Sequence, residues 1–409
     1  MDGKILDTAA KLLSLADEDM KQPEVIRQLQ SPLASGGFGL TSAVQESPIA
    51  YLSSVVSCLS SPTLSQLLQE MSGSPHDASS TSEVSMLHRH LEQCIITIRS
   101  ALNADSQQSL RADLIPTSAS QLLQHYQQHH MVIPFLQQEL KSQVNKLTFQ
   151  TALTHAAEVG DSITATRLLA VSAEGASEWK TTTPSSSQLS LCNTHYQIAA
   201  KMNLGVAPLS LPSHCTSCHS PDACANDPLH PLVCKAHMGT DITIRHDDVK
   251  NTLYLSAHHA GGLARKEPSR LSANGDNTRP DLQMVLNGQQ YLIDVTVRHP
   301  LSQKYLHKSS RNLLHAAMVG EQEKTVKYSP MAAAQKAKFQ TFLSGDIWWL
   351  GKECQRHLSS DPSICQRSHD DVAISAGSGG DERSCSHCNT ERKCNGDVSS
   401  IQQSYIPTC

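Results

Sequence analysis

Two carboxylates in the segment 279–297, which reads RPDLQMVLNGQQYLIDVTV, have a spacing that predicts a metal site. The Asn-Gly pair at 287–288 between alternating apolar runs predicts a β-hairpin, because both central residues of a type I′ turn need positive φ. Extending the ladder from that turn places Asp281 opposite Asp294. Directly opposed like charges destabilise a ladder. The pair therefore predicts a bound cation, and Mg²⁺ is the hard, oxygen-seeking candidate.

The competing interpretation is that these carboxylates are only structural. Acidic residues at strand ends are usually solvated or cap a helix, and Pro280-Asp281 is a common turn dipeptide. A bulge near Gly288 would also slip Asp294 to the opposite face of the hairpin. The metal site therefore depends on the predicted register.

A second group of residues has the spacing of a zinc site. Two residues separate Cys215 from Cys218, eleven separate Cys218 from His230, and three separate His230 from Cys234. Two close ligand pairs joined by a loop can bind tetrahedral Zn²⁺, and four protein ligands leave no open position for water. The pattern predicts structural Zn²⁺, with free cysteines in a turn as the competing interpretation. Nearby residues that could replace a ligand are Cys224, His214, His219 and His237.

The cysteine count and the apolar pattern bound the class of protein. The chain has 409 residues and 13 cysteines, an odd number that favours metal binding over a disulfide framework. No run approaches the ~20 apolar residues of a membrane span, and the first residues lack a signal-peptide pattern. We therefore expect a protein of the nucleus or cytoplasm without a membrane partner.

The formal net charge of −5 is unevenly distributed. Residues 235–352 hold 16 Lys/Arg against 10 Asp/Glu, which leaves 17 against 28 in the rest of the chain. The region around the hairpin is therefore basic, as a phosphate-binding surface would be. An ordinary solvated face is the alternative.

Periodicity divides the chain into a helical part and a mixed part. Apolar residues recur at steps of three and four in several segments, which predicts amphipathic helices. We expect an α+β or α/β protein: a mostly helical N-terminal scaffold, a small zinc module, a mixed sheet flanked by helices, and a disordered tail. The predicted helices are a short one within 1–30, then 86–102, 136–147, 162–173 and 191–204. The predicted divisions are an N-terminal segment with a flexible linker at its end (1–85), the helical scaffold (86–205), the zinc module (206–240), the domain with the mixed sheet (241–352) and the tail (353–409).

The order of these motifs resembles the C-terminal region of non-LTR retrotransposon polyproteins that carry a restriction-enzyme-like endonuclease. The C-C-H-C cluster is followed by Arg245-His246, expected to open an amphipathic helix, and then by the two acidic motifs. GGFGLTSAVQESPIAYLSS at 36–54, LLAVSAEGASEWKTTTPSS and HYQIAAKMNLGVAPL at 195–209 are similar to segments that follow the polymerase in such polyproteins. The resemblance covers roughly 33–345. The Tyr-x-Asp-Asp polymerase signature is absent from the chain, so reverse transcription is not predicted.

This resemblance implies a restriction-endonuclease-like fold that presents two acids and a lysine to a phosphate. Asp281 and Asp294 would hold catalytic Mg²⁺, with Glu267 as a third ligand. An Asp-x-Lys motif would place the lysine at Thr296, so the lysine would come from the following helix. The lysines favoured for this role are Lys324 and Lys327, with Lys304 and Lys308 as alternatives; the residues expected to contact nucleic acid are Arg245, His246, Arg279 and Arg298, while Asp247 receives no role.

Two functions follow from these features. The first is a retrotransposon-derived, Mg²⁺-dependent DNA endonuclease that nicks target DNA and lacks the polymerase core. The second is a catalytically inactive, zinc-containing remnant that only binds nucleic acid. A degraded fragment without function is a third and blander alternative. DNA is the expected partner, with element RNA as a second candidate.

Overall fold

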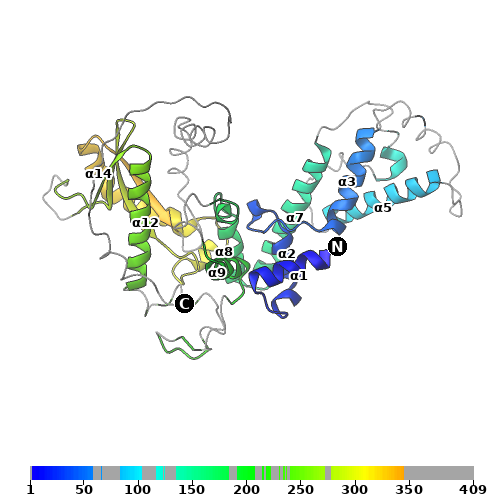
Figure 1. The fold of residues 1–409 in the computed structure, drawn as a ribbon, viewed down its shortest axis with the longest axis horizontal. Coiled ribbons are helices and arrows are strands. Elements are labelled where there is room, and N and C mark those ends of the chain that lie inside the picture. The colour runs from blue at the N-terminus through cyan, green and yellow to red at the C-terminus, as the bar shows by residue number, and fades with distance from the viewer. Residues whose placement is uncertain are drawn as a thin grey trace, which may run out of the picture. The chain divides into compact units, whose positions relative to one another are not determined.

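The computed structural model describes residues 2–58, 83–103, 117–122, 135–183, 191–207, 240–271 and 278–344, with single positions at 66 and 124 and parts of the cysteine cluster at 214–215, 218–222, 230, 234 and 236. These residues form a mixed α+β structure (Figure 1). Within them, no helix has both the length and the apolar character needed to cross a membrane. The predicted disordered tail, with Cys385, Cys388 and Cys394, lies outside the described residues.

Helices make up the N-terminal half of the described chain. The sequence-predicted helices at 86–102, 136–147, 162–173 and 191–204 are all present, and α7 extends well beyond its predicted end. Their bounds are α1 Asp2–Leu13, α2 Pro23–Gln30, α3 Ala43–Cys58, α5 Glu83–Asn103, α7 Leu136–Glu158, α8 Ser162–Val171 and α9 Asn193–Leu204.

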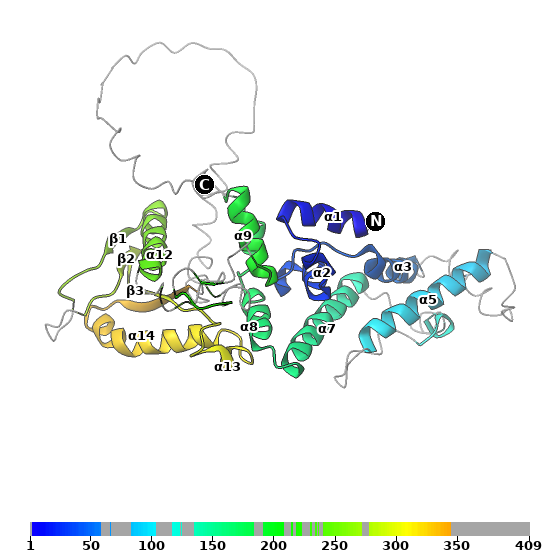
Figure 2. The same cartoon turned by 90° about the horizontal axis from the view of Figure 1, so that it is seen from below.

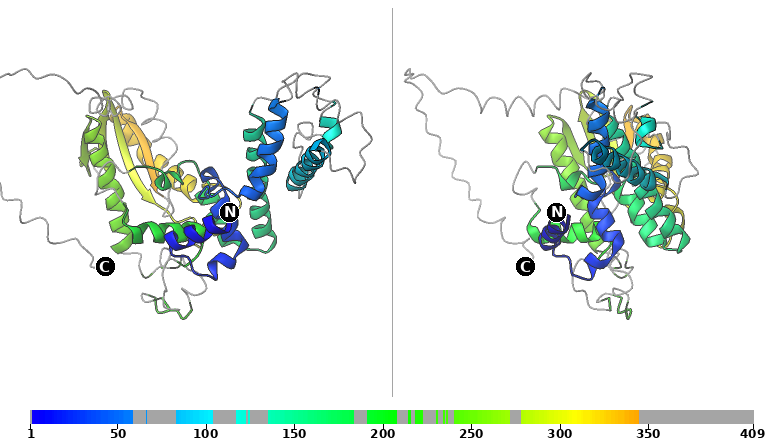
Figure 3. Two further views of the ribbon diagram at one scale, coloured as in Figure 1. Left: turned by 45° about the vertical axis from the view of Figure 1, so that its right-hand side comes forward. Right: turned by 90° about the vertical axis from the view of Figure 1, so that its right-hand side faces the viewer.

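Two apolar clusters hold these helices. In the first, α3, α5 and α7 pack around Leu52, Leu91, Ile95 and Leu140 (Figures 1 and 3). In the second, α1, α2 and α9 pack with residues from the intervening loops. The apolar stripes read from the sequence are therefore core-facing, as the 3.6-residue period requires.

A four-stranded sheet lies in the C-terminal half, in the order β1-β2-β3-β4. The first three strands form an antiparallel meander, and β4 pairs parallel to β3. A parallel pair needs a crossover connection, and α14 provides it between β3 and β4. The elements of this half are α12 Thr240–His259, β1 Leu263–Lys266, β2 Leu282–Leu286, β3 Gln289–Val297, α13 Leu306–Ser309, α14 His315–Ala334 and β4 Lys338–Ser344.

The hairpin between β2 and β3 has the register expected from its turn. Asn287 and Gly288 both have positive φ, 49° and 76°, as a type I′ turn demands. Leu282 pairs with Ile293, and the strand ladder stops there. Asp281 is thus the residue directly before β2, at the same end of the hairpin as Asp294.

Helices cover both faces of this sheet (Figure 2). On one face, Leu253 and Ala257 of α12 pack against Leu282, Ile293 and other strand residues. On the other, Tyr328, Met331 and Ala332 of α14 pack against Leu292. Alternate residues of β3 therefore face different helices, because strand side chains alternate between the two faces.

One expected boundary was wrong. Arg245-His246 was expected to open a helix, but α12 begins at Thr240, so the pair lies inside the helix. Several elements were not predicted from the sequence at all, among them α3 and β4. The expected mixed sheet is present with four strands, of which the sequence placed β2 and β3.

Candidate functional site

The site lies where the sheet-facing stripe of α12 changes from apolar to polar. His246, Lys250, Leu253 and Ala257 follow one another at steps of three or four, so they share one face of the helix. Leu253 and Ala257 are buried against the sheet. His246 and Lys250 continue the same face and bind carboxylates near the ends of the strands.

The sheet-facing stripe of α14 has a polar position as well. Gly320, Tyr328 and Met331 are buried, and Lys324 lies between them at helical spacing. Its ammonium is 2.7 Å from the Oδ2 atom of Asp294. Lys327 is one position away from Tyr328 on the helix and is exposed. Of the two lysines favoured from the sequence, Lys324 is therefore the one that reaches a site carboxylate.

Asp294 follows Ile293, the last residue of β3 that pairs with β2, and is almost completely buried, with its side chain 3% exposed. Thr296, two residues along the same face, donates a hydrogen bond to the Oδ2 atom of Asp294 at 3.3 Å. Lys324 contacts the same oxygen from the helix. A threonine hydroxyl thus lies where an Asp-x-Lys motif would have its lysine, and the ammonium arrives from α14.

The carboxylate of Asp281 is bound from the opposite side of the sheet. Its Oδ2 atom accepts a hydrogen bond from the Val295 backbone N–H at 2.7 Å and lies 3.2 Å from Nε2 of His246. Burial alone would raise the pKa of Asp281, but the hydrogen bonds from His246 and Val295 outweigh it and lower the pKa. The two carboxylates are thus adjacent at the end of the hairpin, yet α12 binds one and α14 the other.

His246 bridges two acids. Its Nδ1 atom is 3.1 Å from the Asp247 carboxylate, and Nε2 contacts Asp281. A neutral imidazole has only one N–H, so both contacts are hydrogen bonds only in the protonated ring. The hydrogen bond to Asp281 accordingly raises the pKa of His246.

Glu267, at the end of β1, is paired with two cations. Its carboxylate is 2.9 Å from Lys250 and 3.2 Å from Arg279, and the bond from Lys250 lowers the pKa of Glu267. Lys250 is nearly buried and also contacts Asp247 at 2.9 Å. The described structure therefore places the Glu267 carboxylate beside Lys250 and Arg279.

Tyr328 links α14 to the segment just before β2. Its hydroxyl donates a hydrogen bond to the backbone carbonyl of Arg279 at 3.0 Å. Burial, together with the nearby Asp294 carboxylate, raises the pKa of Tyr328. The Lys327 ammonium lies over the Tyr328 ring, 4.8 Å from its centroid, so this lysine contacts the site only through an aromatic ring.

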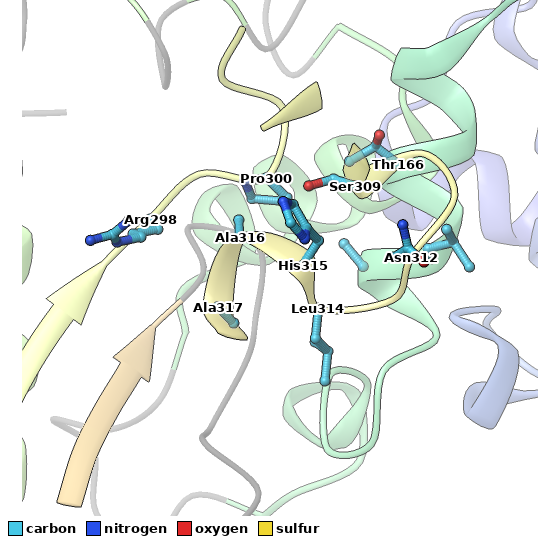
Figure 4. A pocket seen from close by; sticks show the side chains of 11 residues that line it. Thr166, Arg298, Pro300, Ser309, Asn312, Leu314, His315, Ala316 and Ala317 are labelled. Carbon is cyan, nitrogen blue, oxygen red and sulfur yellow. The ribbon is translucent and has the colours of Figure 1, made fainter. Parts of the chain in front are cut away.

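The arginines expected to bind nucleic acid have different surroundings. Arg298, directly after β3, binds the hydroxyl of Tyr305 and the carboxylate of Glu323. Figure 4 shows it at the end of the strand. It lines a small cavity of about 40 Å³ together with side chains of α8. Arg279 is mostly exposed and paired with Glu267. The side chain of Arg245 lies outside the described part of the chain.

The cysteine cluster has the geometry of a metal centre. The ligand atoms of Cys215, Cys218, His230 and Cys234 all lie within 4.8 Å of one another. Among the described residues, this is the group of side chains that could hold a metal ion. The Sγ atoms of Cys215 and Cys234 are 3.8 Å apart, which matches the roughly 3.8 Å edge of a tetrahedron with Zn–S bonds of about 2.3 Å. The distance from Sγ of Cys218 to Nε2 of His230 is 3.4 Å. The four predicted residues therefore come together and could hold a metal ion such as zinc.

Sequence reasoning missed the α12 side of the carboxylate site. Asp247 received no role and Lys250 was not singled out, although both bind site residues. The signal was present in the sequence, because His246 and Lys250 extend the apolar i, i+4, i+7 pattern that continues at Leu253. A polar pair on an otherwise apolar helix face indicates a buried polar partner.

Comparisons with known proteins give no family for this chain. No protein-family model matches it, and no curated protein matches it.

Proposed function

We propose that the chain is a Mg²⁺-dependent DNA endonuclease of restriction-enzyme-like design, derived from a non-LTR retrotransposon. The observation that carries the proposal is the convergence of Asp281, Asp294 and Lys324 at one end of the sheet. Asp281 contacts the backbone of the residue after Asp294, and Lys324 is 2.7 Å from the Asp294 carboxylate. The order of sequence motifs supports the retrotransposon origin, and the basic surroundings support a DNA partner.

The residues present fit the proposed ion. Carboxylate oxygens are the ligands that Mg²⁺ prefers, and two of them with several waters are a usual protein contribution. When bound, Mg²⁺ would polarise a phosphoryl oxygen and lower the pKa of an attacking water. Asp281 and Asp294 would hold the ion from the end of the hairpin.

The lysine supplies a fixed positive charge. Lys324 is half-buried beside Tyr328, and its ammonium is a compact donor that can stabilise negative charge developing on a phosphate. His246 orients the Asp281 carboxylate, and Thr296 orients that of Asp294, so the ligand oxygens are positioned by the protein before substrate arrives. The cysteine cluster would hold structural Zn²⁺.

The proposal is tested by nicking of supercoiled plasmid with the purified full chain, in Mg²⁺ or in EDTA. We expect Mg²⁺-dependent nicking that is lost in Asp281→Asn and in Asp294→Asn. Lys327→Met is the matched control for Lys324→Met, because both remove one lysine charge from α14 and only Lys324 contacts a site carboxylate.

Inactivity of the wild type would contradict the proposal. If the wild type and both aspartate variants fail to nick but bind DNA with equal, salt-sensitive affinity, the chain is the inactive nucleic-acid-binding remnant. Nicking that survives both aspartate substitutions would locate the activity elsewhere or in a contaminant.

A further inference from the structure

A second site is built around a buried arginine in the helical half of the chain. Arg167 on α8 is only 4% exposed, yet no carboxylate contacts it in the described residues. Its Nη1 atom donates hydrogen bonds to Oε1 of Gln28 and to the backbone carbonyl of Asn203, both at 2.6 Å. Burying a cation against neutral acceptors is costly, and burial accordingly lowers the pKa of Arg167 to about 10.

A cavity of about 240 Å³ opens beside this arginine. Its lining comes from α2, α7, α8 and the end of α9, which Figures 1 and 2 show as neighbours. This volume is well above the roughly 30 Å³ that one water occupies in the liquid. The cavity can therefore hold a small polyatomic ligand.

The guanidinium has donors left for such a ligand. Both hydrogen bonds of the Arg167 side chain within the described part of the chain come from Nη1. Nε and Nη2 donate none there. Gly205, which also lines the cavity, allows the guanidinium to lie against the backbone: a Cβ atom there would be 2.4 Å from Nε. Nε and one Nη form the fork that binds two oxygens of a carboxylate or phosphate.

A second basic side chain lines the cavity. Arg27 of α2 lines it and adds a positive charge, and His155 of α7 lines it as well. The hydroxyls of Ser31 and Thr148 that line it already donate to the backbone carbonyls of Arg27 and Val144. Glu24 and Asp161 line it as well, but both are exposed and so are screened by water. Asp161 also accepts the backbone N–H of Thr164 at 2.9 Å as the N-cap of α8. The innermost charge of the cavity is thus a cation.

We propose that this cavity binds a phosphate group, held by the Nε and Nη2 atoms of Arg167 and by Arg27. The site is separate from the proposed nuclease centre and does not depend on it. The phosphate comes either from a nucleic-acid backbone or from a small free phosphate compound, and both would present the same tetrahedral oxyanion to the guanidinium.

The test is a calorimetric titration of inorganic phosphate into the purified full chain, at constant ionic strength and in EDTA. We expect a dissociation constant of about 1 mM or tighter, given two charge-assisted donors. Arg167 is part of the buried structure, so the decisive variants lie around it. Arg27→Gln removes a lining charge and Ala152→Phe fills the cavity without changing charge; each is expected to weaken phosphate binding about tenfold or more.

Lys11→Gln is the matched control, since it removes one exposed positive charge from α1, outside the cavity. It is expected to leave phosphate affinity unchanged. Absence of phosphate binding to the wild type would overturn the proposal. The proposal would also be overturned if Arg27→Gln and Ala152→Phe bound phosphate with the same dissociation constant as the wild type. Thermal unfolding would have to show that both variants are folded.

Competition identifies the source of the phosphate. The Asp294→Asn chain is titrated with inorganic phosphate in the presence of a 12-nucleotide single strand or of adenosine monophosphate. Displacement by the oligonucleotide supports the cavity as a backbone site, and displacement by the mononucleotide alone supports it as a site for free phosphate compounds. Either displacement must disappear in Ala152→Phe, and its persistence there would overturn the proposal.

Discussion

The carboxylate site of the sheet and the buried arginine of the helical half neutralise charge in opposite ways. At the sheet, cations and carboxylates meet in direct pairs: Lys324 with Asp294, His246 with Asp281, and Lys250 with Glu267. Around Arg167 the partners are an amide oxygen and a backbone carbonyl. Nearby, the ammonium of Lys180 is likewise bound by the carbonyls of Gly36 and Gly37.

This difference separates a site whose carboxylates can exchange cations from one whose cation has only neutral hydrogen-bond acceptors among the described residues. A carboxylate that is paired with a protein cation can exchange that cation for a metal ion, because the incoming ion replaces the old partner of the carboxylate. Neutral acceptors do not balance the charge of a cation, and under the proposal above an anion from solvent supplies that charge. The first region is therefore suited to binding cations, and the second to binding anions.

The largest expected effect tests the pairing of Lys324 with Asp294. Lys324→Met should reduce the nicking rate by about 100-fold or more, the usual loss when one fixed charge that stabilises a transition state is removed. Lys327→Met should stay close to wild type, because within the described residues Lys327 contacts the Tyr328 ring and no site carboxylate. Rates are measured on supercoiled plasmid at saturating Mg²⁺.

A second substitution sharpens that prediction. Thr296 already contacts the Asp294 oxygen that Lys324 binds. Adding Thr296→Lys to Lys324→Met should therefore restore part of the lost rate, since the new ammonium arises two residues after the acid on the same face. A double variant no faster than Lys324→Met would mean that the direction of approach, and not only the charge, is required.

An intermediate effect tests the packing of Arg167 against Gly205. Gly205 and Gly160 both have positive φ, 78° and 72°, but a Cβ would meet Arg167 at Gly205 and nothing within 4 Å at Gly160. Gly160→Ala should cost about 1 kcal/mol of unfolding free energy from backbone conformation alone. Gly205→Ala should cost about 2–4 kcal/mol, because overpacking is added.

The two glycine variants are compared by urea unfolding, followed by hydrogen exchange in α8 and α9. Equal costs would show that Arg167 moves freely away from Gly205. The fixed position of the guanidinium, on which the phosphate cavity depends, would then be wrong.

The smallest effect concerns the pH dependence of the His246–Asp281 pair without metal. The pKa of His246 is raised, so its stabilisation is present below the ordinary value of about 6.5 and is lost as pH rises through the folded pKa. The pKa of Asp281 is lowered, so its stabilisation is present above about 3.9 and is lost as pH falls through the folded pKa. The pair therefore stabilises most between about pH 4 and 6.5.

His246→Gln in EDTA should destabilise the fold more at pH 5.5 than at pH 8.5, by less than about 1 kcal/mol because both groups are partly exposed. His259→Gln, an exposed residue at the end of α12, is the control. A destabilisation that is the same at both pH values would show that His246 is held for its shape and not its charge.

Local signals predicted much of this molecule. The Asn-Gly turn determined the register of β2 and β3, because a two-residue loop fixes which residues face each other. The spacing of Cys215, Cys218, His230 and Cys234 likewise predicted the cluster that forms. Both features depend on residues close together in the sequence.

The remaining features depend on long-range contacts. The pairing of β4 with β3 joins residues more than forty positions apart. The sequence KFQTFLS of β4 does not indicate with which strand it pairs. The choice between Lys324 and Lys327 depended on which face of α14 meets the sheet. Asp247 and Lys250 were missed because a single helix does not reveal which carboxylates lie opposite it.

The crossover helix α14 also determines when the site becomes complete during synthesis. The meander of β1, β2 and β3 is formed by local pairings, so both carboxylates can be positioned early. Lys324 is carried by the helix that connects β3 to a parallel strand, and β4 is the last described element of the chain. A ribosome-bound chain that ends before residue 338 has every residue of the carboxylate site but lacks the strand that anchors α14. We therefore expect the nascent protein to gain its lysine contact only after β4 has emerged and paired.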